Sequence, residues 1–202
     1  MTKSVVLAAA LTLVATGCAT TTPTVERETG YAIYQVTPEE GTTAAQIAQA
    51  VQAALQKNTS KVQVTRGIPP SPLPEVSPRF QIVNPFAGSN MAALVARSGA
   101  DMQIPTCEGA LVMATAQNTG MSEYGEGSSF TVCLWQYQAG YHIDIYTTFK
   151  RSSGGFSPEM LGAMLARKVV GDSSQFIPRT VNDIVENVER AGAQVTLVEK
   201  YP

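Results

Sequence analysis

The chain is poor in the side chains that carry out catalysis or bind metals. Its 202 residues include one histidine, three cysteines and one tryptophan, and 15% of them are charged. A zinc site takes about four ligands, most often from Cys and His, and no Cys-x-x-Cys pair accompanies the single histidine, His142. We therefore expect neither a metal site nor a cofactor.

Motifs of the common enzyme classes are also missing. The sequence contains no Gly-x-Ser-x-Gly nucleophile elbow and no Gly-x-x-x-x-Gly-Lys phosphate loop. Gly125-Glu126-Gly127 lacks the third glycine and the strand-to-helix context of a dinucleotide site. The formal net charge is −2 and basic clusters are lacking, so no nucleic-acid partner is expected. The sequence predicts a protein that is not an enzyme and binds no nucleotide.

The N-terminus has the pattern of an export signal. Lys3 precedes an almost unbroken apolar run from Val5 to Ala15, which is shorter than the roughly 20 apolar residues that a membrane-spanning helix needs. A positive charge, a short apolar core and small residues are typical of a cleaved signal peptide. We expect residues 1–17 to be removed, and no later segment is long and apolar enough to span a bilayer.

The junction Ala15-Thr16-Gly17-Cys18 resembles a bacterial lipobox. This resemblance implies that Cys18 carries acyl chains and becomes the first residue of the mature protein; cleavage without a lipid is the alternative. Several acyl chains anchor a protein to a membrane, because each buried methylene contributes about 0.8 kcal/mol. The residue after Cys18 is Ala19 and not aspartate, which resembles the sorting signal of lipoproteins directed to the outer membrane. We expect a lipid-anchored envelope protein, in the outer membrane, with its domain in the periplasm or at the cell surface.

The other two cysteines, Cys107 and Cys133, lie in what would be an oxidising compartment, where two remaining thiols most often pair. We predict a disulfide, with two free buried thiols or a metal site as alternatives. If the two cysteines face each other on antiparallel strands, paired residue numbers add up to about 240, and Leu111 lies near Ser129.

The rest of the sequence predicts one α+β domain, with helices packed on one face of a largely antiparallel sheet. Residues 18–29 are polar and rich in threonine, which is typical of a flexible tether, and residues 30–202 form the domain. Residues 66–78 contain five prolines and are expected to be an extended surface loop, with a polyproline ligand as the alternative. Strands are expected at 31–36, 61–66, 79–83, 109–116, 129–137, 141–149 and 194–198, and helices at 43–56, 89–96, 157–170 and 178–191.

Part of the domain resembles a known family. The stretch Phe80-Gln81-Ile82-Val83-Asn84-Pro85-Phe86-Ala87-Gly88, a short helix with Met91, then Ile104-Pro105 and Leu111-Val112, are similar to the small family called domain of unknown function 302. The similarity would extend from Gly30 to about Phe149. It implies an α+β fold and no established activity.

The candidate ligand-binding residues are Trp135, His142, Asp144 and Tyr146. The last three alternate along the predicted strand 141–149 and therefore share one face. They could form a proton relay or half a metal site, but such a row is more often the wetter face of a sheet. Trp135 could be a ligand platform, but an aromatic side chain in a strand usually packs against helices. We expect a non-catalytic module that binds an envelope protein or a polymer. The alternative is a periplasmic small-ligand or metal-binding protein that uses the His142 face.

Overall fold

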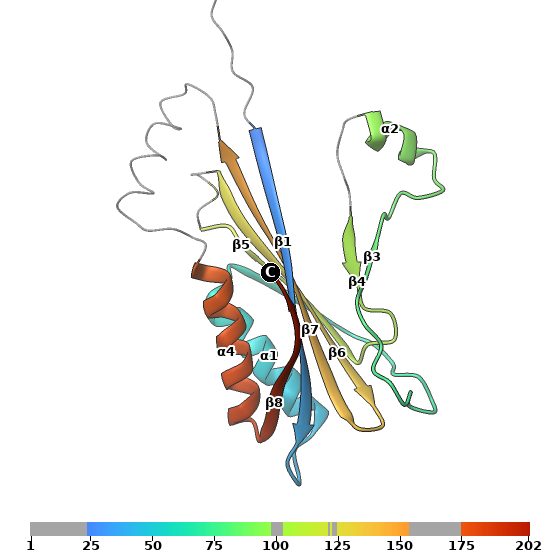
Figure 1. Ribbon diagram of the computed structural model, residues 1–202, viewed down its shortest axis with the longest axis vertical. Helices are drawn as coiled ribbons and strands as arrows, with labels where there is room; N and C mark the ends of the chain where they lie inside the picture. Colours follow the sequence, from blue (N-terminus) through green and yellow to red (C-terminus); the bar gives the residue numbers. More distant parts are fainter. Residues whose placement is uncertain (1–23, 98–102, 121, 123–124, 154–174) are drawn as a thin grey trace, which may run out of the picture.

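The computed structural model describes residues 24–97, 103–120, 122, 125–153 and 175–202 (Figure 1). Its centre is a six-stranded antiparallel sheet with the strand order β2-β5-β6-β7-β1-β8. Its strands are β1 (Thr24–Pro38), β2 (Lys61–Arg66), β5 (Val112–Asn118), β6 (Glu126–Tyr137), β7 (Gly140–Ser153) and β8 (Ala193–Tyr201). A separate two-stranded ribbon consists of β3 (Gln81–Val83) and β4 (Ile104–Thr106), and the helices are α1 (Ala44–Asn58), α2 (Met91–Arg97) and α4 (Phe176–Arg190). The predicted α+β class is confirmed.

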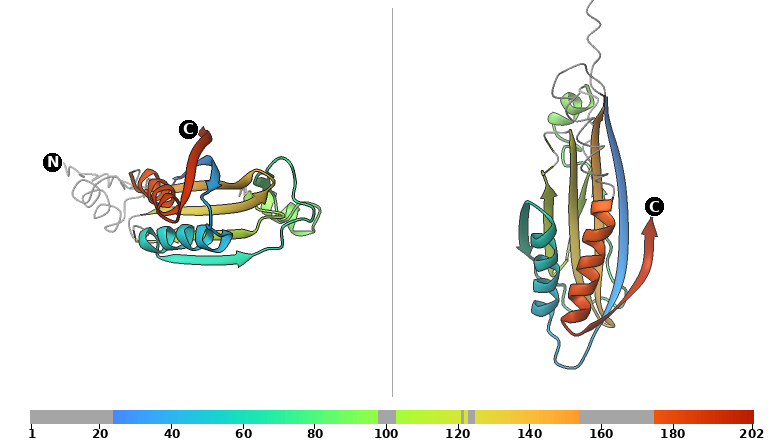
Figure 2. Two further views of the ribbon diagram at one scale, coloured as in Figure 1. Left: turned by 90° about the horizontal axis from the view of Figure 1, so that it is seen from below. Right: turned by 90° about the vertical axis from the view of Figure 1, so that its left-hand side faces the viewer.

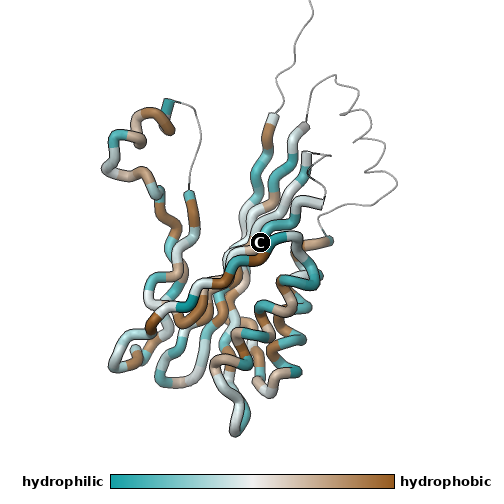
Figure 3. Tube along the Cα trace, turned by 180° about the vertical axis from the view of Figure 1, so that it is seen from behind, coloured by the Kyte–Doolittle hydropathy of each residue, from teal (hydrophilic) through white to brown (hydrophobic). Residues whose placement is uncertain are grey.

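Helices α1 and α4 lie side by side on one face of the sheet, which we call the helix face (Figure 2). Hydrophobic and hydrophilic positions alternate along both helices (Figure 3), as expected for helices with one buried side. The predicted start of α1 is confirmed, because Thr43 and Gln46 form a capping box. The hydrophobic core of this face includes Ile47, Val51, Leu55, Phe130, Val132, Leu134, Ile143, Ile145, Ile184 and Val188.

A proline-rich segment covers part of the opposite face. Residues 67–80, which we call the strap, contain neither helix nor strand, as predicted for a segment whose prolines lack backbone donors. The backbone N–H of Gln138 donates to the carbonyl of Pro74 (3.0 Å), and the Gln138 amide side chain donates to that of Leu73 (3.2 Å). The strap therefore runs across the sheet as a second covering layer, and we call this side the strap face.

The first strand begins earlier than the sequence predicts. Residues 24–29, expected to belong to the tether, form the start of β1 and pair with the end of β7, from Thr24 opposite Ser153 onward. Their side chains are exposed on both faces, so the sequence carries no apolar alternation that would indicate a strand there. The tether prediction is wrong for these residues.

The remaining boundaries differ by a few residues. The predicted hairpin around Gln138 is confirmed, with Tyr137 opposite Gly140, and so is the final helix, which is followed by Gly192 at φ 90°. The predicted helix 157–170 lies outside the described residues. No helix in the described part of the chain is long and apolar enough to cross a membrane.

Candidate functional site on the strap face

The predicted alternation of apolar and polar side chains along β7 is correct, but its polar face is not exposed to solvent. Tyr141, Ile143 and Ile145 belong to the core of the helix face. His142 and Asp144 lie on the strap face, where they are only 8% and 0% exposed. The expectation of a solvated polar row is therefore wrong, because the strap covers it.

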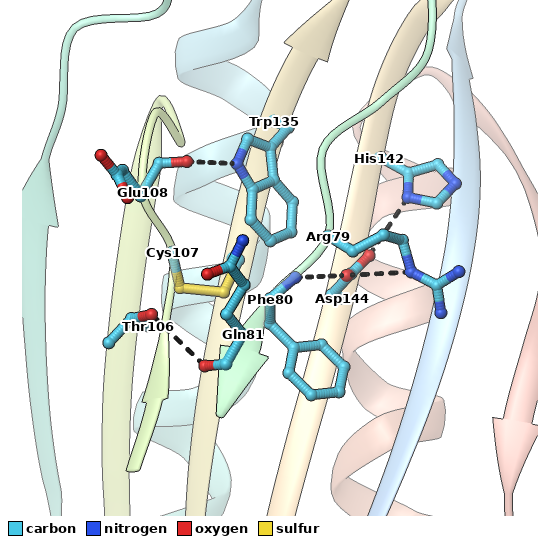
Figure 4. The surroundings of a disulfide bond; sticks show 10 residues. Arg79, Phe80, Gln81, Thr106, Cys107, Glu108, Trp135, His142 and Asp144 are labelled. Carbon is cyan, nitrogen blue, oxygen red and sulfur yellow. Dashed lines mark hydrogen bonds and ion pairs between the residues drawn. A yellow bond between two sulfur atoms is a disulfide. The ribbon is translucent and has the colours of Figure 1, made fainter. Parts of the chain in front are cut away.

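Asp144 is the centre of the polar contacts beneath the strap (Figure 4). Its Oδ2 accepts a hydrogen bond from the backbone N–H of Phe80 (3.1 Å), and Arg79 Nε lies 3.7 Å from the same oxygen. Its Oδ1 lies 3.1 Å from Nδ1 of His142. A carboxylate oxygen accepts hydrogen bonds, so Nδ1 is the donor in the His142 tautomer that bonds to Asp144. A buried carboxylate is costly unless it is paired and hydrogen-bonded, and the strap supplies two of these three partners.

Arg79 extends these contacts to the edge of the sheet. Its Nη2 lies 3.1 Å from Oε2 of Glu199 on β8, and Oε1 of Glu199 accepts a hydrogen bond from the Tyr31 hydroxyl on β1. The hydrogen bond from Tyr31, followed by that from Arg79, lowers the pKa of Glu199, and the same Tyr31–Glu199 bond raises the pKa of Tyr31. Strands β7, β1 and β8 are thus connected through one strap arginine.

Trp135 also faces the strap, and not the helices. It is fully buried in a small apolar cluster with Cys133, Ala110, Phe80 and Cys107. Its indole N–H donates to the carbonyl of Glu108 (3.3 Å), which satisfies the one polar group of the ring. The alternative of packing against helices is therefore wrong, and the indole lies within a closed cluster.

The predicted disulfide between Cys107 and Cys133 is present, with the two Cα atoms 5.6 Å apart. The predicted register is wrong, because Met113 is opposite Cys133 and Gln117, instead of Leu111, is opposite Ser129. Cys107 is not part of β5. A turn at Gly109 (φ 75°) separates the cysteine from that strand, so Cys107 reaches Cys133 from a segment lying over the sheet.

Aromatic rings complete the contact between strap and sheet. The ring of Phe80 lies 5.6 Å from that of Tyr31 and 5.4 Å from that of Tyr146, and the Tyr137 ring meets His142 edge to face at 6.0 Å. All four candidate ligand-binding residues therefore lie on the strap face. The last candidate, Cys18, lies outside the described residues.

Acid–base or metal chemistry at this site is limited because the side chains of His142 and Asp144 are already engaged in contacts within the protein. The carboxylate that meets His142 comes from its own strand, and Asp144 already contacts three partners. Within the described ranges, no group of three or more His, Cys, Asp and Glu side chains could bind a metal ion. Sequence reasoning missed Arg79 and Phe80, whose partner Asp144 is more than 60 positions away and leaves no local signal.

A pocket of about 490 Å³ lies elsewhere, on the helix face. It is bounded by the start of α4, the end of β8 and the middle of β1. Its lining includes Ile177, Val181, Leu197, Tyr201, Phe149 and Gly30.

No family model, curated protein or solved structure matches the chain. The likeness to domain of unknown function 302 stays a prediction.

Proposed function

We propose that this chain is a lipid-anchored protein of the bacterial envelope whose folded domain binds another envelope protein and catalyses no reaction. The proposed membrane anchor rests on the leader sequence and on Cys18. Only five residues separate Cys18 from the start of β1. The observation that carries the non-catalytic part is the burial of His142 and Asp144 beneath the strap.

Those two residues would be the best acid–base pair of the chain, and each has a structural task. Asp144 accepts the backbone N–H of Phe80, a donor in a segment that has no helix or strand to pair it. His142 is bonded through Nδ1 to that carboxylate and covered by Tyr137. A catalytic acid or base must reach its substrate to within hydrogen-bond distance, and these contacts favour a role in fixing the strap. They count equally against a ligand site on the His142 face.

The anchor is tested with the full-length protein extracted from native membranes. Intact-mass measurement should show a mature chain that begins at Cys18 and carries acyl groups, and Cys18→Ser should leave the uncleaved precursor. A mature N-terminus at any other residue would refute the lipid anchor.

The binding role is tested by replacing His142 with Ala and Cys18 with Ser in a strain that lacks the native copy. A binding module depends on its membrane anchor and not on the His142 imidazole. The His142→Ala variant should therefore complement the defect of the deletion strain, and the Cys18→Ser variant should not. The reverse result, with folding of the His142 variant confirmed by circular dichroism, would support an enzyme or a ligand site.

A further inference from the structure

An arm projects from the strap face and presents apolar side chains to solvent. It consists of residues 81–97 and 103–106, which include β3, α2 and β4. Strands β3 and β4 lead away from the strap face to α2, which stands apart from the sheet (Figure 1). Exposed apolar side chains that gather in one part of a molecule indicate an interaction surface. On the arm these side chains are Ile82 (38% exposed), Met91 (48%), Leu94 (61%) and Ile104 (43%).

The arm carries almost no charge. Arg97 is the only charged residue at its positions, and its other polar residues are Asn, Gln, Ser and Thr. Met91 and Leu94 are three positions apart on α2 and therefore share one face of that helix. The interfacial layer of a bilayer accepts a helix in proportion to the apolar area it buries. The long side chain of Arg97, at the end of α2, can extend from such a position to the headgroups.

The arm lies at the end of the molecule from which the proposed anchor extends. Two views at right angles show α2 level with the first residues of β1, at the same end of the long axis (Figures 1 and 2). Only five residues separate Thr24 from Cys18, so acyl chains on Cys18 would hold this end next to the bilayer. Odd-numbered residues of β1, such as Tyr31, face the strap. Val25, which is 64% exposed, therefore adds an apolar side chain on the same side as the arm.

Charges at this end of the sheet are nearly balanced. Glu126 and Arg151 pair across β6 and β7. A surface with both signs in similar number is neither strongly attracted to an anionic bilayer nor strongly repelled by it. A lipid contact here would therefore depend on apolar area. The charged residues in the described part of this end of the sheet are Glu26, Arg27, Glu28, Lys61, Glu126, Lys150 and Arg151.

From these observations we infer that the arm lies in the interfacial layer of the membrane that carries the anchor, with Met91 and Leu94 of α2 in contact with lipid. This second contact fixes the orientation of the domain on the membrane. The inference rests on the proposed lipid anchor. A few apolar side chains bind a bilayer weakly by themselves, but the anchor gives the arm a high effective concentration at the lipid surface.

The contact is tested with the acylated full-length protein, purified from membranes and reconstituted in phosphatidylcholine vesicles. Lipids brominated near the headgroup end of the acyl chain quench an indole that touches them. Trp135 is fully buried and gives the same background in every variant. The indole of Leu94→Trp should lose roughly half of its emission in these vesicles, because an interfacial helix reaches the acyl boundary. The loss should be the same when phosphatidylglycerol is included, because the contact is apolar.

Ile68→Trp is the matched control. Ile68 is 92% exposed and follows β2 near the β6–β7 hairpin, at the opposite end of the sheet, so its indole should not be quenched. Adding Met91→Asp to Leu94→Trp should restore the emission, because a carboxylate in the acyl region is costly. Adding Val76→Asp, at an exposed strap position, should leave the quenching unchanged. Circular dichroism checks that each variant is folded.

Equal quenching of the Leu94→Trp and Ile68→Trp indoles, or quenching that persists with Met91→Asp, would overturn the inference. A Leu94→Trp indole that is not quenched, in a protein that is acylated by intact mass and co-floats with the vesicles, would refute the lipid contact and leave the anchor standing. Capture of a protein by a photo-crosslinker at Leu94 in cells would then identify the occupant of the arm. A chain that has no acyl groups and does not co-float would refute the anchor and this inference together.

Discussion

Two helices cover one face of the sheet, and a strap without regular secondary structure covers part of the other. A helix satisfies most of its own backbone hydrogen bonds, so the sheet beneath α1 and α4 needs to supply few polar partners and contributes a large apolar cluster. The strap has no such internal pairing. The sheet side must therefore supply partners for it, and Asp144 and Gln138 do so. Polar residues are buried beneath the strap because an irregular cover requires them.

The largest effect is expected on the helix face. Ile145→Ala removes a fully buried side chain from the main core and should lower the free energy of unfolding by about 2–5 kcal/mol, as measured by urea denaturation. Val198→Ala, at an exposed position of β8, is the control and should have little effect. A loss below about 1 kcal/mol for Ile145→Ala would show that this face is not the main source of stability.

The next effect concerns the covalent link on the strap face. Replacing Cys107 and Cys133 together by Ser removes a disulfide between residues 26 positions apart, which should lower the free energy of unfolding by about 3 kcal/mol on the chain-entropy description. Hydrogen exchange should increase first around residues 103–110 and the strap, with α1 still protected. Uniform acceleration across both faces would contradict the distinction between them.

A smaller effect is expected from the buried carboxylate. Asp144→Asn keeps the size of the side chain but removes its charge, weakening its bonds to Phe80, His142 and Arg79, with an expected loss of about 1–3 kcal/mol. The amide of Phe80 should exchange faster, while amides of α4 stay protected. Glu186→Gln, which alters an exposed ion pair, is the control. An unchanged Phe80 exchange rate would mean that the strap is fixed by its other contacts alone.

The smallest effect is a pH dependence of stability that comes from Glu199, which pairs with Arg79 on the edge strand β8. The folded-state pKa of Glu199 is lowered from its ordinary value of 4.5 by Tyr31 and Arg79. Its stabilising contribution is therefore complete above pH 4.5 and is lost as the pH falls through the lowered folded-state value. Glu199→Gln should flatten this part of the stability profile in thermal melts between pH 6 and pH 2.5. An identical acid-side decline in the variant would assign it to other carboxylates, such as Asp183, whose pKa is also lowered, by Asn58 and Lys57.

The comparison of the two faces also explains what the sequence could predict. The start of α1 was predictable because Thr43 and Gln46 are three residues apart and satisfy each other locally. The disulfide was predictable from the expected compartment, but its register was not, because a turn at Gly109 takes Cys107 out of the strand. The role of Asp144 depends on residues 64 and 65 positions earlier, and alternation alone cannot distinguish a solvated row from one beneath a strap.

The early start of β1 has a consequence for distance from the membrane. With Cys18 as the anchor, six residue steps lead to Thr24, and a fully extended chain spans roughly 20 Å over six steps. In the lipid-anchored form that we propose, Thr24 would therefore lie within roughly 20 Å of the anchored cysteine. In that form, a protein that docks on the domain would have to approach the bilayer to within about the breadth of the domain.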